Sequence, residues 1–196
     1  MIDEKTKMDI FSKEISYIEN EKYKESARAL ISLLPDYFFE VEASSTGKYH
    51  PAFSLGKGGL VRHTKAAVYF AKELLNNSTF GDAFKQEEKD LMIIGILVHD
   101  GLKHGKEHSK YVTFDHPIVV CDFIKENADK INLKEGEIKF LTHCIESHMG
   151  PWTTNNYSDV VLPAPKDKYQ KFVHMCDYLS SRKSIDMKFE GNEIVE

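Results

Sequence analysis

Residues 91–105 read LMIIGILVHDGLKHG: an apolar run over 91–98, the adjacent pair His99-Asp100 and then, after two further residues, Lys103. The run is typical of a buried helix and is far too short to cross a bilayer. A buried helix seldom ends with an imidazole beside a carboxylate unless a cation holds both, because an uncompensated buried charge costs several kcal/mol. Imidazole and carboxylate are also ligands that first-row divalent metals select. The pair therefore predicts the centre of a metal site.

Apolar side chains follow a helical period along most of the chain. They recur at this spacing over residues 8–19, 22–34 and 60–75. Further helices are predicted over residues 86–98, 134–148 and roughly 166–183, and another starts at 115–117, with an Asp cap and Pro in the first turn, and continues over 118–128. No alternation of apolar and polar residues is long enough to make a sheet. The sequence therefore predicts an all-α, compact helical bundle.

The composition limits the kind of partner and the compartment. A chain of 196 residues that is 41% hydrophobic can bury one globular core. Its net charge of −5 argues against the binding of long nucleic acid by this protein alone. The three cysteines are widely spaced and form no CxxC motif, which is typical of reduced core thiols. The N-terminal residues lack the order of a signal peptide. We expect a cytoplasmic protein with a small anionic partner, no membrane partner and possible homo-oligomers.

Four further imidazole and carboxylate groups surround the pair at wide intervals along the chain: His63, His116, His148 and Asp177. Helical spacing directs His63 and His148 toward the core, and Asp177 lies on one side of the last helix. A single histidine on an apolar face is more often a hydrogen-bonded core residue than a ligand, and a single Asp is more often a surface group. The conjunction of inward histidines on several helices with two carboxylates favours a metal site.

The order His63, His99-Asp100, Asp177 resembles the H…HD…D signature of the HD-domain metal-dependent phosphohydrolase superfamily. Five local segments support the resemblance: GGLVRHTKAAV (58–68), LVHDGLKHG (97–105), DHPIVVCDFI (115–124), ESHMGPW (146–152) and VHMCDYLSSR (173–182). The added histidines resemble the two-metal branch. The chain is similar to the HD domain of some bacterial 3′→5′ exoribonucleases and, more distantly, to HD-GYP phosphodiesterases. The resemblance implies an HD helical bundle over residues 46–186. The helical period before it predicts an N-terminal helical extension over 1–45, and the polar composition after it predicts a polar, peripheral or disordered tail over 187–196.

The resemblance also implies the roles of the ligands. His63, His99, Asp100 and Asp177 would hold a first divalent metal, and Asp100 would bridge to a second held by His116 and His148. Mixed imidazole and carboxylate shells accept Mn, Fe, Ni, Co or Zn, so one or two transition-metal ions are expected without a named element. Asp100 and Lys103 would be catalytic, with a metal-bound hydroxide attacking phosphorus and Lys103 stabilising the charge that develops.

Two features depart from the family pattern. Val120 stands where relatives have Gly, and Met149 stands where many have a second histidine. The replacement at Met149 leaves open whether the second metal site is filled. His143 is an alternative ligand, but it shares a helix face with polar residues, so His148 is the preferred ligand.

Five residues are candidates for substrate contact: Lys57, Arg62, Lys103, Trp152 and Arg182. Lys57 and Arg62 flank a glycine-rich turn that suits an anion, and Trp152 could stack on a base or belong to the core. The expected function is hydrolysis of a phosphoester, monoester or diester, of a nucleotide, cyclic nucleotide or short oligonucleotide. The alternatives are a metal-bound sensing or regulatory module without turnover and a di-iron oxygenase of the HD fold.

Overall fold

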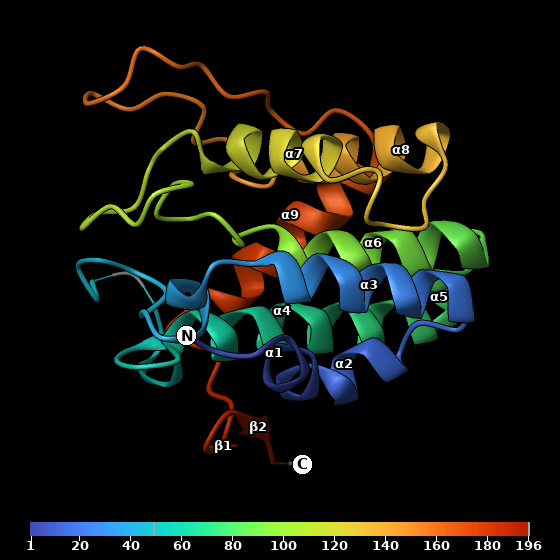
Figure 1. Ribbon diagram of the computed structural model, residues 1–196, viewed down its shortest axis with the longest axis horizontal. Helices are drawn as coiled ribbons and strands as arrows, with labels where there is room; N and C mark the ends of the chain where they lie inside the picture. The colour runs from blue at the N-terminus through green and yellow to red at the C-terminus, as the bar shows by residue number, and fades with distance from the viewer. Residues whose placement is uncertain (49, 196) are drawn as a thin grey trace.

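The computed structural model describes residues 1–48 and 50–195, and in them the fold is an all-α bundle, as predicted (Figure 1). The helices are α1 Glu4–Ile10, α2 Ser12–Ser16, α3 Glu21–Leu33, α4 Gly59–Asn76, α5 Ser78–Gly81, α6 Gln86–Val98, α7 His116–Glu126, α8 Glu135–Ile145 and α9 Lys168–Ser180. Short 3-10 turns lie at Asp36–Phe39 and Ala52–Ser54, and β1 Phe189–Glu190 pairs with β2 Glu193–Ile194. No described helix is both long and apolar enough to span a membrane.

Helix α6 lies at the centre of the bundle. Its residues 90–98 are all buried, and it contacts α3, α4, α8 and α9. A helix that is apolar on every side needs neighbours on every side, which explains the unbroken run over 91–98. The C-terminal end of α6 therefore emerges in the middle of the molecule, where His99 and Asp100 are almost fully buried.

The N-terminal helical stretch is divided, which corrects the prediction of one helix over 8–19. Phe11 separates α1 from α2 with φ −107° and ψ 18°. Its fully buried ring packs against Phe38, with 6.1 Å between the ring centroids, and against Phe39 at 6.3 Å. The break lets Phe11 enter the same core as the residues of α4 and α6. Long-range packing has thus overridden the local helical period.

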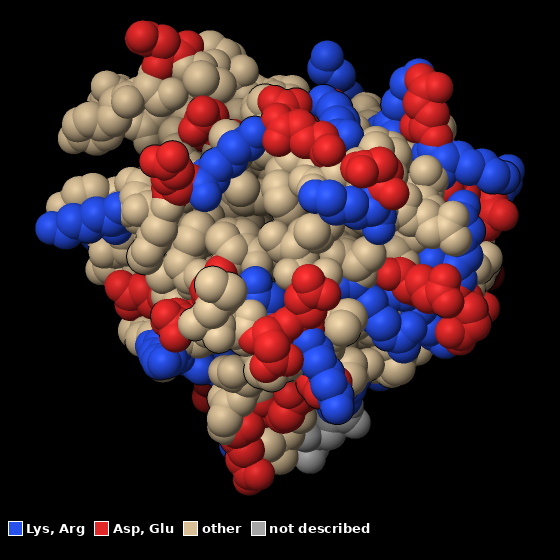
Figure 2. Space-filling model, viewed as in Figure 1, with Lys and Arg blue, Asp and Glu red and all other residues tan. Residues whose placement is uncertain are grey.

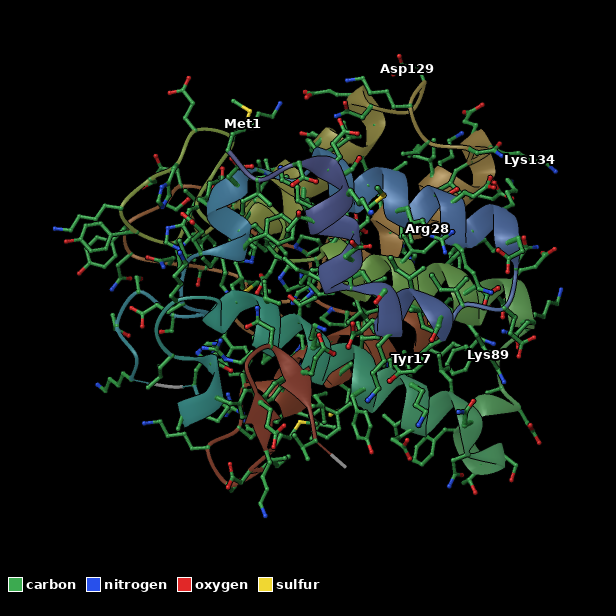
Figure 3. The ribbon with its side chains drawn as sticks, turned by 60° about the horizontal axis from the view of Figure 1, so that its bottom comes forward. Met1, Tyr17, Arg28, Lys89, Asp129 and Lys134 are labelled. Carbon is green, nitrogen blue, oxygen red and sulfur yellow. The ribbon has the colours of Figure 1, made fainter. Side chains whose placement is uncertain are left out.

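Residues 189–194 form a hairpin at the surface, so this part of the tail expected over 187–196 is peripheral and not disordered. Phe189 pairs with Ile194 in antiparallel register, and the Phe189 ring lies 5.0 Å from that of Phe53. Figure 3 shows the hairpin lying across α4.

Charged groups of α4 hold this hairpin in place. The Lys65 ammonium is fully buried; it pairs with Glu193 of β2 and lies 3.2 Å from Glu14 of α2. Arg62 donates a 2.9 Å hydrogen bond to Asn192 in the turn of the hairpin. A buried ammonium requires a carboxylate partner, and the polar tail supplies one of the two carboxylates beside Lys65. The sequence of the tail shows no helical or strand periodicity, because the residues that hold it in place lie on α4.

Candidate metal centre

Six candidate ligands from five segments meet at one end of the bundle. They are His63 of α4, His99 and Asp100 at the end of α6, His116 at the start of α7, His148 in the turn after α8 and Asp177 of α9. They form two groups that share Asp100, and within each group one ligand atom per residue lies within 4.8 Å of the others. Sequence reasoning had selected all six.

The first group consists of His63, His99, Asp100 and Asp177. His63 Nε2 lies 3.0 Å from Asp177 Oδ1 and 3.5 Å from Asp100 Oδ2. His99 Nε2 lies 3.5 Å from Asp177 Oδ1 and 3.4 Å from Asp100 Oδ2. Both Nε2 atoms are buried and have no hydrogen-bond partner among the described residues. Buried polar atoms without partners are costly, so their convergence fits a bound cation.

The second group consists of Asp100, His116 and His148. Asp100 Oδ1 lies 3.1 Å from His116 Nε2 and 3.6 Å from His148 Nε2. The other oxygen of the same carboxylate, Oδ2, faces the first group and also accepts a hydrogen bond from Lys103 Nζ. Asp100 therefore stands between the two groups with one oxygen turned toward each.

The orientation of the histidines leaves their Nε2 atoms free to act as ligands. The Nδ1 atoms of His99, His116 and His148 lie 2.7–2.9 Å from the carbonyl oxygens of Ile96, Thr113 and Ile145. A carbonyl only accepts, so each Nδ1 carries a proton, and each ring in its neutral form presents an Nε2 lone pair. The two lone pairs of His116 and His148 face each other at 3.0 Å. Such an arrangement repels unless a cation or a proton lies between them, so the donor set fits a divalent metal.

The carboxylates of the centre are ionised. Burial by itself raises the pKa of Asp100, but the Lys103 ammonium and the neighbouring imidazoles outweigh it, and the pKa lies well below its usual range. The pKa of Asp177 is likewise held well below its usual range, because His63 and His99 outweigh the effect of burial. The centre thus contains two ionised carboxylates, one of which is paired with Lys103.

The histidines differ in their protonation. Burial lowers the pKa of His148 to about 4 and also lowers that of His63, so both rings are neutral near pH 7. Burial also acts to lower the pKa of His99, but Asp100 and Asp177 outweigh it and raise this pKa above its ordinary value. His99 is therefore the ligand from which a metal must displace a proton.

We expect the affinity for a divalent metal such as Mn²⁺ to rise as the pH increases from about 6 to about 8, on either side of the ordinary histidine pKa. The raised pKa of His99 means that the metal-free protein keeps this proton at pH values where an ordinary histidine has lost it, and binding must release it. Calorimetric titration in two buffers of different ionisation enthalpy measures the protons released. An affinity that does not change with pH would contradict this assignment.

The turn after α8 depends on a glycine. Gly150 has φ +68°, and a Cβ placed on it would lie 2.1 Å from Cε1 of His174. The His174 ring cannot withdraw freely, because its Nδ1 donates a 2.7 Å hydrogen bond to the carbonyl of His148. The same short turn therefore positions a ligand and requires a residue without a side chain.

Gly150→Ala is expected to lower the free energy of unfolding by about 2 kcal/mol or more, from left-handed strain and the clash together, and to weaken metal binding through His148. Thermal unfolding and metal titration measure the two effects. Gly136→Ala is the matched control, since a Cβ there meets nothing within 4 Å and α8 favours alanine. Equal stability of the two variants would show that the turn tolerates a side chain.

A cavity of about 780 Å³ opens beside the metal centre. Figure 1 shows the loops that surround it at one end of the bundle. Its lining includes the ligands His116 and Asp177 together with Lys103, Trp152 and Arg182, three of the five residues expected to contact substrate.

The other two residues expected to contact substrate, Lys57 and Arg62, do not line this cavity. Arg62 donates hydrogen bonds to the carbonyl oxygens of Phe53, Leu55 and Lys57, so its guanidinium holds the loop that enters α4. The Lys57 side chain is 80% exposed and lies 3.4 Å from Glu40. Adjacent helical residues point about 100° apart, so Arg62 diverges from the inward His63.

His143 lies outside both groups. Its Nε2 lies 2.6 Å from Asp167 Oδ2, and its side chain is 43% exposed. His148 occupies the position facing Asp100, although α8 ends at Ile145 and the turn, not a helical row, directs it inward.

His50, His174 and Tyr178 also line the cavity and were missed by sequence reasoning. His50 packs edge-on against His63 with 5.3 Å between ring centroids, and burial lowers its pKa to about 3. It stands in a loop without periodicity, so no local pattern marks it. Tyr178 could have been found, since it lies four residues before Arg182 in the predicted helix over 166–183, although α9 ends at Ser180.

Comparison with known proteins agrees with this geometry. The family model named HD domain matches residues 57–182, a segment that contains all six candidate ligands. No curated protein and no solved structure gives a significant match to the chain. Because the matched segment covers more than half of the sequence, the chain belongs to the HD domain family.

Proposed function

We propose that the protein is a metal-dependent phosphohydrolase that cleaves a phosphoester of a nucleotide, cyclic nucleotide or short oligonucleotide. The observation that supports this most directly is the position of Asp100. Its two oxygens face two separate ligand groups, and Lys103 and the open cavity lie beside it. A pair of divalent ions at such a shared carboxylate supplies Lewis-acid charge and an activated water for phosphoryl transfer.

The residues of the chain contribute positioning and charge. Asp100 and Asp177 provide the negative charge that holds the cation, and the carbonyl-bound histidines hold their Nε2 atoms in place before it binds. Lys103 lines the cavity while it donates to Asp100, so its ammonium lies where charge accumulates on the phosphoryl oxygens. Five of the six ligands are almost completely buried, and the partly exposed Asp177 lines the cavity.

The distribution of charged side chains on the face shown in Figure 2 favours a small substrate. Figure 2 shows Lys and Arg side chains interspersed with Asp and Glu over the face in view, with no continuous basic stripe. Long nucleic acid requires many phosphate contacts, whereas a small phosphoester needs only the cations inside the cavity. We therefore propose that the substrate enters the cavity whole or by one end.

A sensing module without turnover is the second candidate, and Met149 favours it. Met149 lines the cavity where many relatives have a histidine, so the second group has three protein ligands among the described residues. For a sensing module, Asp100→Ala should abolish metal binding and leave nucleotide affinity intact. For the hydrolase, the same change abolishes hydrolysis.

The proposed function is tested by a screen of nucleotides, cyclic nucleotides, dinucleotides and simple phosphoesters with Mn²⁺, Fe²⁺, Co²⁺, Ni²⁺ and Zn²⁺. We expect phosphate release that depends on added metal and disappears in Asp100→Asn. No hydrolysis with any metal, in a protein that binds none of them, would overturn the proposal. Oxygen-dependent optical changes of the iron form would instead identify an oxygenase.

A further inference from the structure

One wall of the cavity is built from aromatic rings and a guanidinium. The planes of Trp152 and Tyr178 are within 17° of each other, with 6.0 Å between centroids. The Arg182 guanidinium carbon lies 4.1 Å from the centroid of the Tyr178 ring, and the His174 ring is 5.9 Å from it. All four side chains line the cavity. They combine a stacking surface with a positive charge.

This wall is attached to the metal centre at two points. Tyr178 follows the ligand Asp177 in α9, and His174 donates to the carbonyl oxygen of the ligand His148. A group resting on the wall therefore has a fixed place relative to a phosphoryl group at the metal centre.

Trp152 has free aromatic surface. Its side chain is 50% exposed, whereas Tyr178 is only partly exposed and is covered by Arg182. An indole whose only role is packing would be expected to bury most of its surface, as Phe11 and Phe38 do. The exposed part of Trp152 is available for another ring.

No carboxylate among the described residues pairs with Arg182. Its hydrogen bonds go to the carbonyl oxygen of Tyr178 and the hydroxyl of Ser181. Neither acceptor carries a charge. Guanidinium binds phosphate well because of its planar, multiple donors, so an unpaired Arg182 beside the cavity suits an anionic group.

We infer that the exposed surface of Trp152, which stacks on Tyr178, forms the subsite for a nucleobase, and that Arg182 binds a second phosphate of the same substrate. The inference rests on the proposed function and narrows its substrate to nucleotides that carry another phosphate besides the one cleaved. Base stacking on an aromatic side chain contributes enough to change affinity by roughly 10-fold or more.

Trp152 is the single tryptophan of the chain, so intrinsic fluorescence reports on this wall directly. The unmodified protein, loaded with metal, is titrated with a nucleoside bisphosphate, with the same nucleoside carrying one phosphate, and with glycerol phosphate. The two nucleotides should quench the tryptophan emission, and glycerol phosphate should not. The bisphosphate should bind more tightly. Absence of quenching by either nucleotide would overturn the base subsite.

Kinetics separate the two roles. Trp152→Leu should lower kcat/KM by roughly 10-fold or more for both nucleotides, through KM, and by less than about 2-fold for glycerol phosphate. Arg182→Gln should remove the preference for the bisphosphate, and Arg182→Lys should restore part of it. An equal loss for all three substrates would show a purely structural role and overturn the inference.

Two matched variants control for a change in the loop that carries Trp152 and for the loss of a positive charge near Arg182. Tyr157→Leu removes a 97% exposed aromatic of the loop that carries Trp152, and Lys183→Gln removes an exposed charge next to Arg182; neither residue lines the cavity. Both should behave as the unmodified protein. If nothing is hydrolysed, the proposed function fails, but quenching by nucleotides would still support the base subsite.

Discussion

Asp100→Asn is expected to lower kcat/KM for any phosphoester substrate by at least about 10³-fold, which corresponds to about 4 kcal/mol. Asn keeps the volume of the side chain but removes the charge that both ligand groups share. It also leaves the buried Lys103 ammonium without the carboxylate to which it donates. Since changing an outer partner of a ligand already costs roughly 10–100-fold, losing the shared ligand should cost more.

The measurement combines phosphate release with metal analysis of the purified variant. The metal content should fall for both groups at once, because each uses one oxygen of Asp100. Asp122→Asn is the control: this carboxylate is exposed on α7 and pairs only with Lys125 at 3.1 Å among the described residues. An Asp100→Asn protein that retains both metals and substantial turnover would show that the carboxylate does not bridge the groups.

His148→Ala is expected to reduce the bound metal from two ions toward one. The second group would keep only Asp100 Oδ1 and His116, whereas the first group would keep all four of its ligands. Activity should fall by more than the roughly 10–100-fold of an outer partner. Metal content per chain and a titration with Mn²⁺ followed by paramagnetic resonance measure the loss.

The matched change is His143→Ala, five residues earlier on the same segment. His143 binds Asp167, which also caps the start of α9, so its loss should lower stability slightly and leave the metal content unchanged. The opposite ranking, with more metal lost from His143→Ala than from His148→Ala, would show that the turn after α8 rearranges when metal binds.

The helices and the identity of the ligands follow from local patterns. The predicted range 86–98 coincides with α6, and the range 60–75 is one residue short of α4 at each end. Helical periodicity depends on neighbours three and four residues apart, so a single sequence carries it. Ligand identity is also readable, because few side-chain types bind divalent metals and a buried carboxylate needs a cation.

Other features depend on partners far along the chain. The break at Phe11 follows from its packing on Phe38, and the hairpin after residue 187 follows from the buried charge of Lys65. Arg62 was expected at the substrate, but three carbonyl oxygens of the preceding loop hold it elsewhere. No local pattern records such contacts.

The sequence by itself determined the all-α bundle, the central buried helix and the set of six candidate ligands. Only the tertiary structure decided that Asp100 turns one oxygen toward each ligand group, and that Trp152 from a loop meets Tyr178 of α9 and Arg182 just after α9 at the cavity. The physical reason is distance along the chain: helix formation and side-chain chemistry are local, whereas the direction of a carboxylate and the meeting of a loop with a helix are set by packing between separate elements.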